Sequence, residues 1–168
     1  MTEADRVNFE RLDIISVDLA MVQRFLSAYL DRALYNSQGC PDGVLAEALT
    51  VAIIVTYARP FTRSKNRFGK WEDLDLSFLT APLSDGQRGL HQRTMAERDK
   101  AFAHSDAGPQ NIKVIDTPDG RLTVSNVVRV LLEKWEAEEL MENVRKMKAV
   151  LEPRLEELRV AINSDGGC

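Results

Sequence analysis

The chain has 168 residues, 44% of them apolar, and a formal net charge of −4. This length and composition predict a single soluble domain, spanning residues 1–168, that is large enough to bury a core. The acidic balance argues against a protein that coats nucleic acid through bulk electrostatics.

Three sequence features bear on location. The first five residues have no basic flank followed by an apolar run, so no secretory signal is predicted and we expect a cytoplasmic protein. Cys40 and Cys168 do not make a disulfide framework, which is consistent with a reducing compartment. The longest mostly apolar stretch, Leu45 to Ala58, contains Glu47 and falls short of the roughly 20 residues that a bilayer requires. We therefore expect a core helix there and no membrane contact.

The first third of the chain predicts two helices. From Ile14 to Tyr35 apolar residues recur every three to four positions on two neighbouring stripes, which indicates contacts on two sides of a helix. A turn rich in Gly and Pro follows at 38–43. The second helix is expected from about Val44 to Ala58, because the residue that precedes Pro60 avoids the helical region.

The middle of the chain is more polar. Residues Trp71 to Leu79 suggest a short helix with Trp71, Leu74 and Phe78 facing inward. Ser84 is expected to cap a third long helix, roughly Asp85 to Ala103. That helix has few apolar residues, and a polar helix in a small bundle often borders a site or an interface.

The last third predicts a hairpin and one long helix. The segments 112–115 and 121–124 flank a turn that contains Asp119-Gly120, which is typical of a short hairpin. Ser125 is expected to cap the final helix, whose apolar stripe runs from Val128 to Leu158. Pro153 allows a kink in this helix, and Glu142 and Lys146 are spaced as an ion pair on its outer face.

Together these elements predict an all-α fold. We expect a bundle of long antiparallel helices, with one small β-hairpin between the third long helix and the last one. Residues 1–12 and 163–168 are expected to fray.

The segment Arg98-Asp99-Lys100-Ala101-Phe102-Ala103-His104-Ser105-Asp106 carries the clearest chemical signal. Histidine titrates near neutral pH and moves protons, whereas arginine stays charged and grips a phosphate with two parallel hydrogen bonds. Arg98 and His104 are therefore candidate groups for phosphodiester chemistry without a metal. The sequence has no zinc-ligand spacing, Walker loop, dinucleotide fingerprint or Glu-x-x-His pair. We accordingly expect no metal and no cofactor.

This segment resembles the Arg-polar-x-His signature of the HEPN superfamily, helical-bundle proteins of phage-defence and toxin–antitoxin systems, many of them RNases. The Tyr57-Ala58-Arg59-Pro60-Phe61 element and the helix, hairpin, helix order after the motif resemble a subfamily linked to abortive infection. The resemblance implies a homodimeric, metal-independent endoribonuclease with its active site between protomers. His104 would then be the general acid or base, Arg98 would neutralise phosphoryl charge, and Asp99 would orient one of them. It also implies control by a cognate antitoxin protein.

Geometry restricts how Arg98 and His104 can meet. On a regular helix, residues six apart point about 120° from each other and lie about 9 Å apart along the axis. Convergence on one phosphate requires either that the helix end near Ala103, so that His104 swings back, or that two copies of the chain face each other. The sequence leaves both arrangements open.

A basic segment accompanies the motif. Between Arg59 and Lys70 there are five basic residues and no acidic one, which favours a phosphate-bearing partner. We expect the RNA backbone to be bound by residues of this region and of the motif, namely Tyr57, Arg59, Arg63, Lys65 and Lys100.

These residues also have purely structural interpretations. His104 can bond a backbone carbonyl at a helix C-terminus, and Arg98 can pair with a surface carboxylate. His91 lies on Arg98's helical face about two turns away, and partial burial is the commoner fate of such a histidine. The alternative function is therefore a catalytically inactive HEPN-like dimer that binds a partner protein or a nucleotide.

Overall fold

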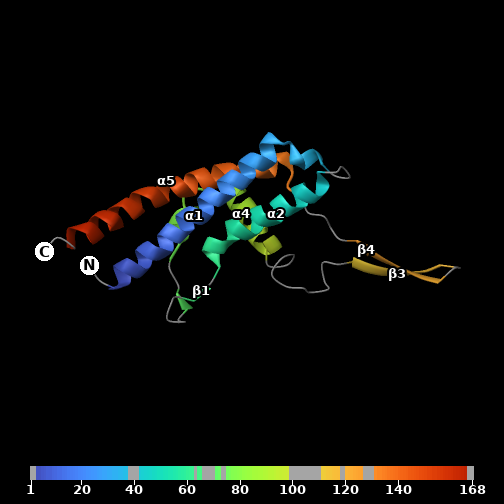
Figure 1. Ribbon diagram of the computed structural model, residues 1–168, viewed down its shortest axis with the longest axis horizontal. Helices are drawn as coiled ribbons and strands as arrows, with labels where there is room; N and C mark the ends of the chain where they lie inside the picture. The colour runs from blue at the N-terminus through green and yellow to red at the C-terminus, as the bar shows by residue number, and fades with distance from the viewer. Residues whose placement is uncertain are drawn as a thin grey trace.

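The computed structural model describes residues 3–37, 42–62, 64–65, 71–72, 75–98, 111–117, 120–126 and 131–165. Two long helices, α1 (Glu3–Asp31) and α5 (Lys134–Asp165), run side by side along the molecule (Figure 1). The helix α2 (Gly43–Ala58) packs on α1, and α4 (Asp85–Glu97) lies against both α2 and α5. The predicted all-α helical bundle is therefore confirmed.

The remaining elements are short. Two 3-10 turns extend the ends of α1 and α2, a single helical turn precedes α4, and the strands form two separate antiparallel pairs. These elements are η1 (Leu34–Asn36), η2 (Arg59–Phe61), β1 (Ser64–Lys65), β2 (Trp71–Glu72), α3 (Ser77–Thr80), β3 (Asn111–Thr117) and β4 (Gly120–Asn126).

The core lies mainly between α1 and α5. Apolar residues at helical spacing are buried on both helices, which is the amphipathic pattern that drives helices together. Each of the larger ones contributes about 1.5–3 kcal/mol by leaving water. The buried residues of this seam are Leu12, Ile15, Leu19, Val22, Leu26 and Tyr29 on α1, and Ala137, Leu140, Val144, Met147, Leu151 and Leu155 on α5.

The described helix boundaries correct two predictions in the first part of the chain. The helix α1 begins at Glu3 rather than near Ile14, because Phe9 packs against the core and an Arg6–Glu10 ion pair supports the first turns. It ends at Asp31 rather than Tyr35, because Ala33 adopts a left-handed conformation with φ of 52° that a helix cannot continue through.

Two further predictions, in the middle and last parts, are wrong. Trp71–Glu72 form strand β2 instead of starting a helix, and the helical residues there are only Ser77–Thr80, where Asp75 accepts a hydrogen bond from the Ser77 N–H at 2.9 Å. Ser125 lies in β4 and pairs with Ile112, so it does not cap α5, which starts at Lys134.

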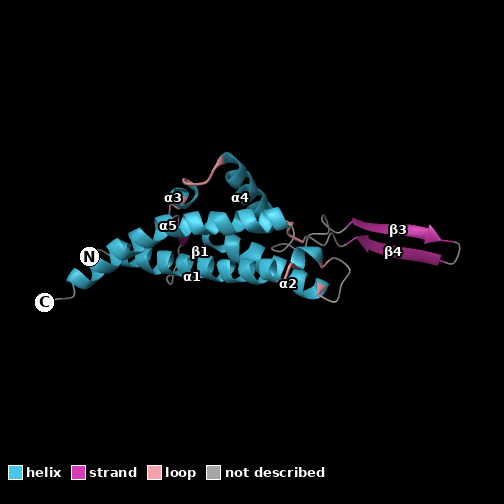
Figure 2. Ribbon diagram, turned by 90° about the horizontal axis from the view of Figure 1, so that it is seen from above, coloured by secondary structure: helices cyan, strands magenta, loops and turns pink. Residues whose placement is uncertain are grey.

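The β3–β4 hairpin extends from one end of the bundle (Figure 2). Its antiparallel register runs from Asn111 opposite Asn126 to Thr117 opposite Gly120. This is the segment in which the sequence predicted a hairpin.

The apolar helix α2 is buried on one side. Gly43–Phe61 is long and apolar enough to cross a membrane by length and composition alone. However, α2 buries Ile53, Ile54 and Tyr57 among the other helices, as the core helix of a soluble protein does. One such helix is weak support for a membrane span.

Candidate functional site

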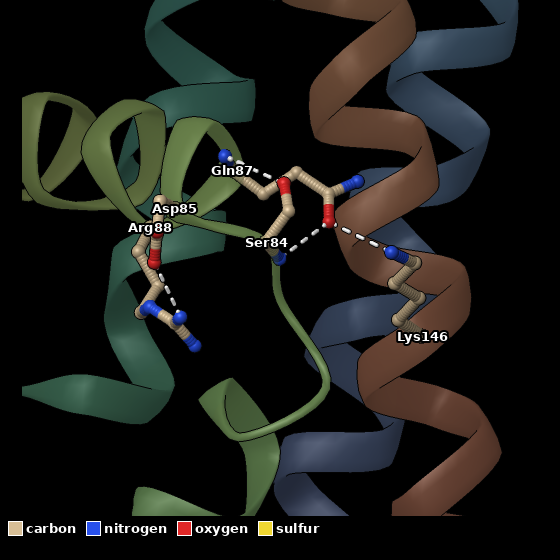
Figure 3. A network of polar contacts seen from close by, with 5 residues as sticks. All are labelled: Ser84, Asp85, Gln87, Arg88 and Lys146. Atoms are coloured by element: carbon tan, nitrogen blue, oxygen red, sulfur yellow. Dashed lines mark hydrogen bonds and ion pairs between the residues drawn. The ribbon is translucent and has the colours of Figure 1, made fainter.

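The N-terminal end of α4 is fixed by reciprocal hydrogen bonds. The Gln87 N–H donates to Ser84 Oγ at 3.3 Å, and the Ser84 N–H donates to Gln87 Oε1 at 3.0 Å, which is a capping box. The predicted cap at Ser84 is thus confirmed. The same Gln87 oxygen accepts a hydrogen bond from Lys146 Nζ of α5 at 2.8 Å (Figure 3).

This contact overturns the expected Glu142–Lys146 pair. Lys146 turns toward α4, and Glu142 instead pairs with Arg145 at 3.5 Å. The half-buried ammonium group of Lys146 contacts the amide oxygen of Gln87 because the capping box holds that oxygen in place. The first turn of α4 is therefore attached to the middle of α5.

A second set of polar contacts lies deeper, where α2, α4 and α5 meet. Asn143 is fully buried on α5 and donates through Nδ2 to the Tyr57 Oη and to the backbone carbonyl of Gln87, each at 3.4 Å. The Tyr57 Oη lies 3.1 Å from Nδ1 of His91. Three helices thus contribute to one chain of hydrogen bonds.

His91 is surrounded by aromatic rings. Its ring stands edge-on to Phe61 with centroids 4.6 Å apart, and edge-on to Tyr57 at 5.7 Å. Burial lowers the pKa of His91, since a charged imidazolium loses hydration there. Burial likewise raises the pKa of Tyr57. Both groups are therefore uncharged at neutral pH.

Arg59 is engaged in an ion pair across the helices. Its Nη1 donates to Oδ1 of Asp18 at 2.8 Å, and the Asp18 side chain is only 5% exposed. Burial raises the pKa of Asp18, and the adjacent Arg59 charge partly opposes that shift. Much of the Arg59 charge is accordingly balanced by Asp18 rather than offered to a ligand.

The C-terminal end of α4 carries Arg98. Its backbone is still helical and its N–H reaches the carbonyls of Thr94 and Met95. Arg98 is half-buried and has an interaction with its surroundings. Because seven residues span nearly two full turns, Arg98 shares a face of α4 with His91.

The opposite flank of this end contacts the start of α5. Arg93 donates to Glu136 at 2.6 Å and lies 5.4 Å from the centroid of the Trp135 ring. Glu97 is half-buried beside them, and burial, reinforced by the charge of Glu136, raises its pKa. These contacts hold the helix that carries Arg98 against α5.

The structure places only some of the predicted site residues. Tyr57 is fully buried, so its phenol contacts His91 and Asn143 rather than the surface. Lys65 is described by its backbone in β1. The other predicted residues lie outside the described part of the chain, and they are Arg63, Asp99, Lys100 and His104. The Arg98–His104 geometry thus stays a prediction.

Sequence reasoning did not identify Gln87 and Asn143 as members of a polar cluster. A signal for Asn143 exists, because it falls between Leu140, Val144 and Met147 on the apolar stripe of α5. A buried amide at such a position needs polar partners from another element.

Comparison with known protein families, with curated proteins and with solved structures finds no match. Among the described residues, no group of three or more His, Cys, Asp or Glu side chains is arranged to hold a metal ion. The class that the structure defines is an all-α bundle with a polar cluster between α2, α4 and α5.

Proposed function

We propose that the chain is a HEPN-type, metal-independent endoribonuclease of a phage-defence or toxin–antitoxin system. The observation that supports this most is the position of Arg98 at the end of α4, a helix anchored by a capping box at one end and by the Arg93–Glu136 pair at the other. A phosphate-binding arginine needs such a rigid base, because catalysis depends on preorganised charge.

The proposed reaction needs only side chains. The ribose 2′-hydroxyl attacks the adjacent phosphorus, the bond to the 5′-oxygen breaks, and a 2′,3′-cyclic phosphate forms. His104 carries out one of the two proton transfers, taking the 2′-hydroxyl proton or giving one to the departing 5′-oxygen, and water carries out the other. Arg98 neutralises the charge on the phosphoryl oxygens. Asp99 orients Arg98 or the partner protomer's histidine. Proton transfer and charge stabilisation are each worth roughly 10²–10³-fold in rate.

The burial of Tyr57 and the pairing of Arg59 change the RNA contacts that we propose. Arg63, Lys65 and Lys100 keep the role of binding the phosphate backbone. Arg59 is partly neutralised by Asp18, so its contribution is smaller than the sequence suggested. Tyr57 is buried and takes the role of positioning His91 instead.

A homodimer is part of the proposal, because two protomers can bring Arg98 and His104 together. Apolar side chains on the outside of α1 and α2 offer a surface for a second copy, and burying them removes exposed apolar area from water. These side chains are Ile14, Val17, Val44, Leu45 and Val51. A cognate antitoxin protein and a cytoplasmic location remain expectations from the resemblance and the sequence.

The net charge of −4 favours one alternative, a catalytically inactive HEPN-like dimer that binds a partner protein or a nucleotide. In that case Arg98 and His104 stabilise the dimer interface rather than a transition state.

Cleavage of total RNA and tRNA by the purified protein in EDTA tests the two functions. We expect products with cyclic-phosphate ends, and a loss of at least about 100-fold in rate for His104→Ala and Arg98→Ala. Arg88→Ala is the matched control, because Arg88 lies on the same helix and pairs with the exposed Asp85. A folded, dimeric wild type that leaves every RNA intact supports the inactive binding module.

A further inference from the structure

The hydrogen bonds around His91 determine where its proton lies. The Asn143 amide nitrogen can only donate, so the Tyr57 oxygen is the acceptor in that contact. A buried hydroxyl also needs an acceptor, and Asn143 Oδ1 makes no hydrogen bond, so we assign the Tyr57 hydroxyl proton to His91 Nδ1, which lies 3.1 Å from Tyr57 Oη. Because Nδ1 accepts, a neutral His91 carries its single proton on Nε2.

The contacts of His91 fix the position of its ring as well as its tautomer. Phe61 and Tyr57 contact it from η2 and α2, and the side chain still reaches the surface because it is only half-buried. No rotation of the ring is possible without breaking the Tyr57 contact. His91 is therefore a fixed, uncharged N–H donor at the edge of the α2–α4 contact.

His91 and Arg98 share one face of α4. Seven residues correspond to about 10 Å along the helix axis, so the two side chains cannot hold the same phosphate. A single strand that runs along this face meets them at different nucleotides. Arg98 attracts a phosphate by charge, whereas an uncharged N–H donor suits an acceptor on a neighbouring nucleotide.

We propose that His91 is a second RNA-contacting residue, donating through Nε2 to the nucleotide next to the one that Arg98 holds, with Tyr57 and Asn143 as positioning residues that set its tautomer. This inference rests on the proposed ribonuclease function, since it takes single-stranded RNA as the ligand. It assigns to a residue of α4 a role that the motif itself does not contain.

Nitrogen-detected histidine NMR tests the tautomer directly. The chain has two histidines, so His104→Ala leaves His91 as the only imidazole. We expect its spectrum to show a protonated Nε2 and an unprotonated Nδ1 at neutral pH. Tyr57→Phe removes the hydroxyl but keeps the ring, and we expect it to produce a mixture of tautomers. A predominant Nδ1–H form, or no change in Tyr57→Phe, overturns the positioning role.

Binding of a single-stranded oligonucleotide with 2′-O-methyl riboses, which cannot be cleaved, tests the RNA contact. His91→Asn keeps an oxygen near the Nδ1 position for Tyr57 but removes the outer donor, and His91→Gln keeps an amide nitrogen near Nε2. We expect about tenfold weaker binding for His91→Asn and at most about threefold for His91→Gln. The His91 Nε2 signal should shift on binding.

Four results bear on this inference and on the proposed function, and the first three separate the two. Equal binding by wild type and His91→Asn, or an unshifted His91 signal in a bound complex, overturns the RNA contact and leaves the proposed function standing. Cleavage of natural RNA that depends on His104 but not on His91 has the same meaning. Absence of oligonucleotide binding by wild type together with absence of cleavage overturns both.

Discussion

The helix α5 makes two kinds of contact that differ in chemistry. Its contact with α1 is mainly apolar, although Lys148 Nζ also donates a hydrogen bond to Gln23 Oε1 of α1 at 3.2 Å. Its contact with α4 and α2 includes hydrogen bonds in which Asn143 and Lys146 donate and Glu136 accepts. The apolar contact supplies most of the stability, and the polar contact determines where α4 lies along α5, because a hydrogen bond tolerates little displacement.

The largest effect should come from truncating the apolar contact. Leu140→Ala removes a fully buried side chain from α5, and we expect a loss of about 3–5 kcal/mol in the free energy of unfolding, measured by urea denaturation. Val160→Ala, at a position 55% exposed on the same helix, should change it by about 0.5 kcal/mol or less. Similar losses for the two variants would contradict the placement of the core.

Asn143→Ala should have the next largest effect, at the polar contact. It leaves the Tyr57 oxygen without the Asn143 donor and removes the side-chain donor from the Gln87 carbonyl, and we expect a cost of about 1–3 kcal/mol. Combination with Tyr57→Phe in a double-mutant cycle measures the coupling, which should be about 0.5 kcal/mol or more. Additive effects of the two substitutions would show that they do not interact.

The cap of α4 should contribute less. Ser84→Ala removes the acceptor for the Gln87 N–H, and we expect a loss of about 1 kcal/mol in the free energy of unfolding. Ser84→Gly leaves the end of the helix open to water and should cost only a few tenths of a kcal/mol. Equal losses in the two variants would argue against a side-chain cap.

The smallest effect concerns pH. Because the pKa of His91 is lowered in the fold, its contribution to stability is complete above its ordinary pKa of 6.5 and is lost as the pH falls through the folded value. The raised pKa of Asp18 acts in the opposite direction, since acidification removes the cost of its buried charge. The two effects therefore oppose each other in acid.

Thermal melts at pH 7.5 and 5.5 separate these contributions. Between these two pH values the Tm of wild type should fall further than the Tm of His91→Asn, because the variant lacks the titrating ring. The difference between the two falls should be about 2 °C or less. The groups packed on His91 are Tyr57 and Phe61, and neither becomes charged in this range. A larger acid loss in the variant would reverse the assigned direction.

The sequence predicted the parts of the fold that depend on neighbours in the chain. The apolar stripes of α1 and α5 and the Ser84 cap follow from residues a few positions apart. The early start of α1 was missed because residues 3–13 contain few apolar side chains and rely on packing. The strand at Trp71 was missed for a similar reason, since short apolar runs do not distinguish strand from helix.

The polar contacts were beyond sequence reasoning because their partners are distant in the chain. Asp18 and Arg59 are 41 residues apart, and Asn143 and Tyr57 are 86 apart. No local pattern pairs these residues, because each pair forms only when the helices pack together. The same limit applies to the candidate site, where Arg98 was located by its motif but the role that we propose for His91 depends on Tyr57 and Asn143.

Pro153 sits inside α5, which continues to Asp165 without a break. A proline has no N–H, so the carbonyl of Ala149, one turn earlier, loses its usual donor. Both residues are exposed, and water can solvate that oxygen instead. The missing hydrogen bond thus lies on the outer side of the helix, opposite the buried Leu151 and Leu155. The proline therefore costs α5 one backbone hydrogen bond on its solvent side and leaves its packed face intact.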